Sequence, residues 1–531
     1  MTVEQIKTAI DNGQTILGIE FGSTRIKSVM LGPDHLPIAS GSFTWENRYE
    51  NGLWTYYMDD AWEGLRESYK ALADDVFDKY GTKLKKIGAI GISGMMHGYL
   101  PFDRDGNQID AFRTWRNTNT SAAAAELTKL FDFNVPLRWS ISQLYQSILE
   151  NMDHVKDLDY MTTLSSYIHW QLTGEKVIGI GEASGMFPID SAINDYDQRM
   201  LDQFEQLIVD KNYKWRIRDV LPKVLVAGKN AGYLTPEGAA KLDPSGLLEP
   251  GIPMAPPEGD AGTGMVATDS VGVRTGNVSA GTSIFSMIVL EKQLSRVYEE
   301  IDMVTTPCGK PVAMVHCNNC TSDFDAWTGL FSEVIEASGN YMDKDDLFTM
   351  LYTKSLEGDP DCGGIMVYNY VSGEPVTGLL EGRPLVIRKV DAKFTLANFL
   401  RAEIYSAFAA LRIGMGILDN ENVVIDRLMG HGGLFKTPGV SQCYLAAATG
   451  AEVSVMKNAG EGGPYGMALL ADYMVNRKDS ETLDEFLDGT IFSSDEKITV
   501  SPDQETVDGY RKYLDDYITA LGVEEKAVEL F

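Results

Sequence analysis

The sequence predicts an α/β fold built from two similar domains, and three observations support this prediction. At 531 residues the chain is too long for a single hydrophobic core. Runs typical of strands alternate with runs of helical periodicity along most of its length. A short pattern of strand, glycine with small hydroxylated residues, and strand occurs at 19–31 and again, 259 positions later, at 278–290. This repeat indicates two domains of related structure.

Composition narrows the class of protein. A hydrophobic content of 44% and a charged content of 23% are typical of a soluble globular protein. The formal net charge of −30 disfavours binding to nucleic acid or to anionic membranes, because both depend on excess Lys and Arg. No run of about 18 apolar residues is present, and the first residues do not resemble a secretory signal. We therefore expect a cytoplasmic protein.

Cysteine usage agrees with that compartment. Five cysteines in 531 residues are few and odd in number, which is not typical of a disulfide framework. Cys317 and Cys320 form a C-x-x-C pattern, but no second ligand pair follows at zinc-site spacing. Two buried free thiols are the favoured interpretation, and a redox or metal role is the alternative.

The first half of the chain begins with three predicted strands at 15–19, 26–31 and 37–43. A helix follows at 60–80, where apolar side chains recur at helical spacing. A short apolar strand at 86–92 leads into the loop 93–98, and loops at the carboxyl ends of such strands commonly line ligand sites.

The second half begins after 251–260, a segment rich in Pro and Gly that we take as the domain boundary. The expected elements are then helices at 396–418 and 464–475, strands at 423–428 and 452–455, and a helical, acidic tail at 501–531. Thr437 and Pro438 are expected at the N-cap and first position of another helix that ends at Gly450.

The two repeated hairpins are candidate phosphate sites. A tight turn that exposes N–H groups and hydroxyls can hold phosphate oxygens. The first turn offers Gly22, Ser23 and Thr24, with Lys27 close by, and the second offers Gly281 and Thr282. No G-x-x-x-x-G-K-[ST] motif is present, so the chain is not a P-loop enzyme.

Glu20 directly precedes the first of these turns. A carboxylate beside a phosphate is unfavourable unless a cation lies between them, and Mg²⁺ binds through one or two carboxylates together with phosphate oxygens. Glu20 is therefore a candidate metal ligand. The alternative is an ordinary hairpin with an exposed glutamate.

Asp260 lies between Glu258-Gly259 and a glycine-rich stretch. An aspartate within hydrogen-bond reach of a substrate hydroxyl can accept its proton during phosphoryl transfer. The alternative is an ordinary helix N-cap, which local sequence alone favours.

Two further segments are candidate ligand contacts. His97 follows Met96 in the loop after the buried strand, and a polar group against apolar surface suits an uncharged ligand such as a sugar. A hydrogen-bonded core histidine is the alternative. Gly432 and Gly433 follow a predicted strand and would let backbone approach a flat ring or a ribose, although such pairs are usually only turns.

In their order and spacing, these motifs resemble those of the FGGY carbohydrate kinases, a family of the actin-like, sugar-kinase and heat-shock-ATPase superfamily. Within it the chain looks most like the ketopentose kinases of the xylulokinase type. The resemblance spans 16–476. It is carried by two phosphate motifs, a Ser-Gly-Met-Met-His-Gly loop, a Gly-Asp-Ala segment, a Ser-Gly-Glu segment and a glycine motif, at 18–24, 279–283, 93–98, 259–261, 372–374 and 430–433.

The resemblance implies two ribonuclease-H-like (actin-like ATPase) domains with a catalytic cleft between them. Residues 1–262 would form a sugar-binding domain and 263–531 an ATP-binding domain with the acidic tail. ATP and Mg²⁺ would be required, and a homodimer is a candidate assembly by analogy. The resemblance implies catalysis by Asp260, metal binding by Glu20 and Asp260, sugar binding by Met96, His97, Trp115, Asn117 and Asp260, and ATP binding by Ser23, Thr24, Lys27, Gly281, Thr282, Gly432 and Gly433.

The chain departs from the family pattern around the expected sugar pocket. The family usually has Asp at the position of Glu20, and Trp-Asn-Asp where this chain has Trp115-Arg116-Asn117. Ser165-Ser166-Tyr167 replaces Lys-Asp-Tyr, and the second signature, at 382–403, is loose. Arg116 could reach an anionic substrate group. A kinase for another polyol or sugar (erythrulose or glycerol), a non-kinase actin-like ATPase and a sugar sensor remain alternatives.

Overall fold

The computed structural model describes residues 1–456, 462–493 and 497–531. The chain forms two compact units, and each is described by itself. The first comprises 1–271, 303–312 and 460–494, and the second comprises the remaining segments. The segment 460–494 thus groups with the first unit, although it follows the second hairpin in the sequence.

The main sheet of the first unit has five strands in the order β13-β6-β1-β2-β3. Strand β1 is antiparallel to β2 and parallel to β6, and β6 is parallel to β13. The four strands predicted in this region are confirmed, with small shifts at their ends. They are β1 (Ile16–Phe21), β2 (Arg25–Leu31), β3 (Pro37–Thr44) and β6 (Ala89–Gly94). The fifth strand, β13 (Glu258–Gly259), was not predicted.

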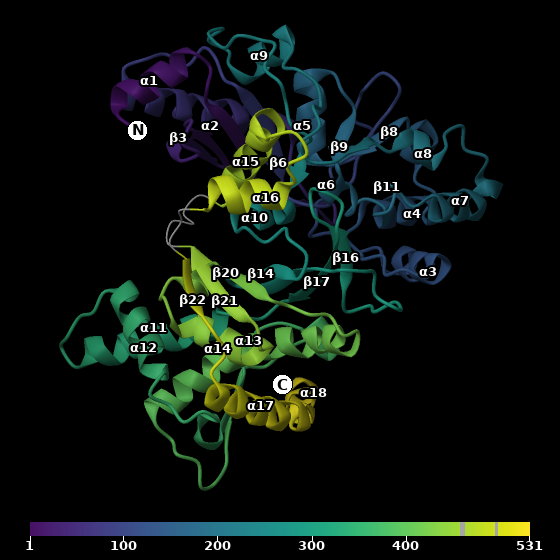
Figure 1. Ribbon diagram of the computed structural model, residues 1–531. Helices are drawn as coiled ribbons and strands as arrows, with labels where there is room; N and C mark the ends of the chain where they lie inside the picture. Colours follow the sequence, from purple (N-terminus) through teal and green to yellow (C-terminus); the bar gives the residue numbers. More distant parts are fainter. Residues whose placement is uncertain (457–461, 494–496) are drawn as a thin grey trace. The chain divides into compact units, whose positions relative to one another are not determined.

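Helices from both ends of the chain pack on this sheet. Helix α2 (Met58–Tyr80) lies on β3 and buries the apolar stripe that the sequence predicted. Helix α15 (Gly463–Asn476) packs on β1 and β6 and against α10 (Asp260–Ala267). In Figure 1 the yellow α15 lies among elements of the first unit. The segment that carries Asp260 is therefore packed against a helix more than 200 positions later.

The remaining elements of the first unit surround this core. They are α1 (Val3–Asp11), β4 (Arg48–Glu50), β5 (Leu53–Thr55), β7 (Leu100–Phe102), α3 (Ser121–Phe131), α4 (Ser140–Leu149), β8 (Tyr160–Thr162), α5 (Leu164–Thr173), β9 (Val177–Gly179), α6 (Ile180–Ala183), β10 (Ile189–Asp190), β11 (Asp195–Tyr196), α7 (Gln198–Leu207), α8 (Ile217–Val220), β12 (Lys223–Leu225), α9 (Pro236–Leu242) and α16 (Leu483–Phe486).

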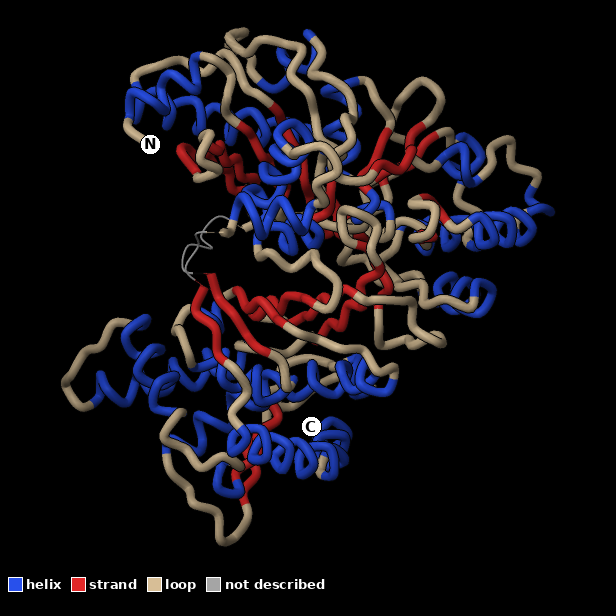
Figure 2. The backbone as a smooth tube through the Cα atoms, viewed as in Figure 1, coloured by secondary structure: helices blue, strands red, loops and turns tan. Residues whose placement is uncertain are grey.

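A second sheet has seven strands in the order β16-β17-β15-β14-β20-β21-β22. Helices α13 and α14 pack on strands of this sheet, and Figure 2 shows them beside its red strands. Its elements are β14 (Thr275–Ala280), β15 (Ile284–Val289), β16 (Asp302–Thr305), β17 (Pro311–Cys317), α13 (Leu396–Asn420), β20 (Arg427–His431), α14 (Val440–Thr449), β21 (Glu452–Met456) and β22 (Lys497–Val500).

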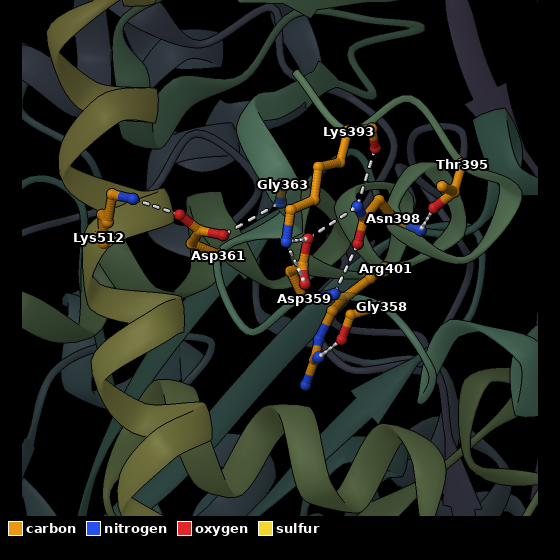
Figure 3. A network of polar contacts seen from close by, with 9 residues as sticks. All are labelled: Gly358, Asp359, Asp361, Gly363, Lys393, Thr395, Asn398, Arg401 and Lys512. Carbon is orange, nitrogen blue, oxygen red and sulfur yellow. Dashed lines mark hydrogen bonds and ion pairs between the residues drawn. The ribbon is translucent and has the colours of Figure 1, made fainter. Parts of the chain in front are cut away.

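The second unit is completed by α11 (Ser322–Ala337), α12 (Lys344–Ser355), β18 (Ile365–Tyr368), β19 (Leu385–Arg388), α17 (Gln504–Thr519) and α18 (Leu521–Leu530). Figure 3 shows how polar side chains fix the start of α13 there. Asn398 donates to Asp359 (3.3 Å) and also accepts from its backbone N–H (2.6 Å). Lys512 of α17 pairs with Asp361 in the same loop.

The structure corrects two predictions of element boundaries. The helix expected from Thr437 begins at Val440, with Gly439 as its N-cap in the left-handed region (φ 89°). The strand expected at 423–428 is β20, Arg427–His431. Of the helices in the described ranges, none combines the length and the apolar character that crossing a membrane requires.

Candidate active site

The candidate catalytic residues of the first unit lie at the carboxyl ends of three adjacent parallel strands. The strand register aligns Glu20 of β1 with Ser93 of β6, and Ser93 with Glu258 of β13. His97 and Asp260 follow directly after β6 and β13. Because parallel strands end at the same edge of a sheet, three separate sequence motifs are brought together there.

Asp260 is fixed by two backbone groups. Its Oδ1 accepts hydrogen bonds from the N–H of Met96 (3.0 Å) and from the N–H of Ala261 (2.9 Å). Its Oδ2 receives no hydrogen bond from any other described residue. Burial raises the pKa of Asp260, whereas the two backbone N–H groups act to lower it. Asp260 is the first residue of α10, and Gly259 is the N-cap. The alternative interpretation of Asp260 as the N-cap is therefore wrong by one residue.

Glu20 carries a strongly perturbed carboxyl group. Its pKa is raised to about 7, first by burial and then by the negative charge of Asp260, while Lys27 opposes the rise. Lys27 is the cross-strand partner of Glu20 in the hairpin. Two carboxylates that destabilise each other's charged forms become compatible when a cation binds beside them.

Glycine at position 463 makes room for the Glu20 carboxylate. A Cβ atom built on Gly463 would lie 1.9 Å from Oε1 of Glu20, a distance that excludes any side chain in this arrangement. Gly463 begins α15 and is followed by Pro464, which suits the first turn of a helix. The helix that the sequence predicted at 464–475 therefore starts against the candidate metal ligand.

Two further buried carboxyl groups belong to this site, and the sequence analysis assigned neither a role. Glu258 accepts from the N–H groups of Gly181 (3.2 Å) and Glu182 (2.9 Å), and burial raises its pKa to about 7. Glu182 is fully buried, and only the Thr163 side chain acts to lower the pKa of its carboxyl group. Burial holds the pKa of Glu182 well above its usual range, and Asp260 adds to the rise. Both effects favour the protonated form of Glu182.

The loop after β6 is held in a strained conformation. His97 has φ 70°, a left-handed conformation that is uncommon for residues other than glycine. Its Nδ1 lies 3.3 Å from the carbonyl oxygen of Gly185, and its ring stacks on Trp139. Burial, with Arg138 nearby, holds the pKa of His97 well below its usual range. A neutral imidazole that donates from Nδ1 leaves Nε2 as an acceptor for a ligand hydroxyl.

The structure places Trp115 and Asn117 in different environments. Trp115 is 40% exposed, as expected of a residue that can contact a ligand. Asn117 is buried, and its side chain is already hydrogen-bonded to the backbone of Trp54, through Oδ1 (2.9 Å) and Nδ2 (2.8 Å). In this conformation Asn117 fixes the segment that carries Trp54.

The tip of the first hairpin is exposed, and two of its carbonyl oxygens accept hydrogen bonds from aromatic side chains. Ser23 and Thr24 are exposed. The indole of Trp45 donates to the carbonyl oxygen of Gly22 (2.7 Å), and the hydroxyl of Tyr56 donates to that of Ser23 (2.7 Å). The two aromatic rings stack on each other at 4.2 Å. The tip is thus supported by side chains from a neighbouring segment.

The second unit contains four of the residues predicted to bind ATP, at Gly281, Thr282, Gly432 and Gly433. Register places Ser279 of β14 beside His431 of β20, so the next residue, Gly432, reaches the tip formed by Gly281 and Thr282. Gly432 has φ 97°, and a Cβ built on it would lie 2.4 Å from the carbonyl oxygen of Ala280. Only glycine fits there. Gly433 has no atom within 4 Å of its built Cβ and faces open space.

The C-x-x-C segment supports this second tip. The N–H of Cys320 donates to the carbonyl oxygen of Thr282 (3.1 Å). Both thiols are buried, and burial raises the pKa of each far above its usual range. Between them, Asn319 accepts from the N–H of Ser372 (3.0 Å) and donates to Glu374 (3.1 Å), which locks the segment in place. Buried protonated thiols fit the structural interpretation.

The residues around Asp260 also suit a magnesium ion. No cluster of three or more His, Cys, Asp and Glu side chains suited to a metal occurs in the described ranges. Mg²⁺ does not require such a cage, because it is commonly held by one or two carboxylates together with water and substrate phosphates. Glu20 and Asp260 supply two carboxylates, and burial together with the charge of Asp260 raises the pKa of Glu20.

Comparison with known proteins adds a family relationship. Residues 15–267 match the N-terminal domain of the FGGY family of carbohydrate kinases, and residues 276–475 match its C-terminal domain. Xylulose kinase of Haemophilus influenzae is 22% identical over 445 residues, which cover 82% of this chain and 84% of that protein.

Two crystal structures have a similar fold. Gluconate kinase from Lactobacillus acidophilus has a TM-score of 0.78 and 15% identity, covering 96% of this chain and 98% of that chain. Ligand-bound xylulose kinase from the same organism has a TM-score of 0.77 and 15% identity, covering 96% and 99%. These similarities confirm the predicted two-domain α/β fold.

Proposed function

The chain belongs to the FGGY family of carbohydrate kinases, and we propose that it transfers the γ-phosphoryl group of ATP to a terminal hydroxyl of a ketopentose of the xylulose or ribulose type. One observation carries the proposal most directly. The Met96 N–H donates to Asp260 at 3.0 Å, which joins the loop expected to bind the sugar to the expected base. The similarity to xylulose kinases supports the ketopentose as acceptor.

Asp260 would act as the general base. As the sugar oxygen bonds to the γ-phosphorus, the hydroxyl proton passes to Oδ2 of Asp260 and the bond from phosphorus to the leaving oxygen of ADP breaks. The two backbone hydrogen bonds to Oδ1 orient the carboxylate and favour its ionised form. Most of the catalysis is positioning and charge stabilisation.

Glu20 and Asp260 would hold Mg²⁺. When bound, the metal neutralises charge on the phosphate oxygens. Glutamate stands where the family usually has aspartate, and Gly463 leaves space for the longer side chain. The close approach of Gly463 to the Glu20 carboxylate supports the proposal that Glu20 replaces the family's aspartate as a metal ligand.

The remaining predicted residues would bind the two substrates. His97 would accept a hydrogen bond from a sugar hydroxyl at Nε2. Met96 and Trp115 would provide apolar contact, and Asn117 would shape the pocket through its bonds to Trp54. Phosphate oxygens would be bound by Ser23, Thr24, Lys27, Gly281 and Thr282, and the adenosine by Gly432 and Gly433.

The experiment is ADP release measured against a panel of ketoses and polyols, with the wild type and Asp260→Asn. One ketopentose should stimulate release many-fold, and Asp260→Asn should lower its kcat by about 10²- to 10⁴-fold. Asp503→Asn, at a residue that caps α17, serves as the matched control and should retain wild-type activity.

Other results would redirect the proposal. Stimulation by glycerol or erythrulose alone would replace the ketopentose with another polyol. Sugar binding without ADP release at high Mg²⁺ would contradict catalysis and favour a sensor.

A further inference from the structure

Arg116 lies flat on an aromatic ring without an acidic partner. Its Cζ is 3.6 Å from the ring centroid of Trp54, and Nη1 donates to Oδ1 of Asn47 at 3.4 Å. No carboxylate in the described part of the chain lies within ion-pair distance of this exposed guanidinium. A guanidinium stacked in this way keeps its planar edge available for a bidentate contact.

Arg48, on the nearby hairpin β4–β5, provides an internal comparison. Its Cζ lies 4.5 Å from the ring centroid of Tyr57, so it is also stacked on an aromatic side chain. Unlike Arg116, it pairs with Asp60 at 2.9 Å. The charge of Arg48 is thus already compensated within the protein, whereas that of Arg116 is available to a ligand.

Hydrogen bonds fix the backbone of Trp54, the residue on which Arg116 is stacked. Asn117 bonds to both the N–H and the carbonyl oxygen of Trp54, and the N–H of Thr114 donates to the same carbonyl oxygen (3.3 Å). The N–H of Arg116 itself donates to Oγ1 of Thr114 (3.3 Å). A side chain on a fixed backbone and a fixed ring loses little further freedom when it binds a ligand.

Arg116 is connected to the tip of the first hairpin through Tyr56. The positive charge of Arg116 and a hydrogen bond with Asn47 both act to lower the pKa of Tyr56, although burial keeps that pKa raised to about 12. The hydroxyl of Tyr56 donates to the carbonyl oxygen of Ser23. Arg116 is therefore within electrostatic range of a group that touches the candidate phosphate turn.

The segment that carries Arg116 is also connected to the His97 loop, through Asn117 and helix α4. The carbonyl oxygen of Asn117 accepts from Nε2 of Gln143 (3.0 Å) on α4. Ser140, the first residue of α4, donates to the carbonyl oxygen of Gly98, which follows His97 (2.5 Å). Arg116 thus acts on Tyr56, which bonds to the phosphate turn, and its chain neighbour Asn117 is connected through helix α4 to the sugar loop of the first unit.

We propose that Arg116, held by Trp54 and Asn47, binds an oxyanion on the acceptor side of the site. The oxyanion is either the carboxylate of a sugar acid or the phosphoryl group that is transferred. The first source would extend the acceptors from neutral ketopentoses to sugar acids. The inference rests on the proposed kinase function, but its binding test does not depend on turnover.

The binding test uses calorimetry on the full chain with D-gluconate, inorganic phosphate and neutral xylitol. Variants are Arg116→Ala, Arg116→Lys and the control Arg48→Ala. The wild type should bind at least one anion, with a Kd that rises about 10- to 100-fold in Arg116→Ala and stays within twofold in Arg48→Ala. Arg116→Lys should fall between, because it keeps the charge and loses the planar fork. Equal anion binding by the wild type and Arg116→Ala would overturn the proposal, as would no anion binding.

Turnover then distinguishes the two sources. If the carboxylate is the ligand, Arg116→Ala lowers kcat/KM about 10-fold or more for sugar acids and leaves neutral ketoses unchanged. If the phosphoryl group is the ligand, kcat falls for every acceptor. If no acceptor stimulates ADP release by the wild type, the kinase function fails, and the binding result still decides whether Arg116 binds oxyanions.

Discussion

The two glycine hairpins have similar sequences but carry different chemistry. In the first, Phe21 pairs with Ile26, leaving 22–25 in the loop, whereas in the second Ala280 pairs with Ile284, leaving only 281–283. The loop of the second hairpin is thus one residue shorter.

This difference changes which residues face each other. Glu20 lies opposite Lys27 in the first hairpin. At the matching position, Ser279 lies opposite Phe285 in the second. The second hairpin therefore has no counterpart of the acidic Glu20 or of the basic Lys27. Its tip can offer a phosphate only N–H groups and hydroxyls. The duplicated motif predicts a phosphate-binding turn, and one pair of facing residues, one in each strand, decides whether the turn also carries charged groups.

The strongest test of this comparison changes the two matching positions. Glu20→Gln should lower kcat on the order of 10²-fold, because it removes the charge that we propose to act on the metal and the phosphates. Ser279→Ala, the matched change in the other hairpin, should alter kcat less than twofold. ADP release with the best ketose, measured over a range of Mg²⁺ concentrations, gives both values. Equal losses in the two variants would mean that the hairpins share the catalytic work.

A second test uses the pH dependence of stability. The folded state raises the pKa of Glu20 from 4.5 to about 7, so it binds this proton more tightly than the unfolded state does. Stability is therefore lost as the pH rises through this window, and Glu20→Gln removes the loss. Relative to the wild type, Glu20→Gln should gain about 2–3 kcal/mol in free energy of unfolding between pH 5 and pH 8.

Urea unfolding with a chelator present measures this gain. Other buried carboxyls, such as Glu258, titrate in both proteins, so only the difference between variant and wild type reports on Glu20. Ser279→Ala replaces a group that does not titrate and should differ from the wild type by a constant amount at both pH values. A constant difference for Glu20→Gln as well would show that its carboxyl is not destabilised by the fold.

The sequence could predict the parts of this site that depend on short segments. Gly22 and Asp260 lie in local motifs, and the predicted strands on either side of Gly22 were enough to place it in a hairpin turn. Glu182 could not be predicted as a buried acid with a raised pKa, because burial depends on packing by distant segments. The only sequence signal for Glu258 was its position two residues before Asp260, and that signal has no specificity.

Tertiary packing also explains what could not be predicted at the level of single residues. Asn117 matched a sugar-binding position, but its hydrogen bonds to Trp54 form only when two segments 63 positions apart meet. The first turn of α14 was assigned to Thr437 and Pro438, whereas the chain uses a left-handed Gly439 instead. Local capping preferences are weak compared with the geometry of the preceding loop.

The smallest effect on stability is expected where a glycine faces a movable side chain. In Gly463→Ala the new methyl group meets only the end of the Glu20 side chain, which can rotate away, so the free energy of unfolding should change by less than about 1 kcal/mol. Activity should nevertheless fall about 10-fold, because the carboxylate is displaced. In Gly432→Ala, the counterpart behind the second hairpin, the methyl group meets backbone at φ 97°, and a loss of about 2–4 kcal/mol is expected. Adding Gly463→Ala to Glu20→Ala should then have no further effect on kcat, and an additive loss would show that Gly463 acts independently of Glu20.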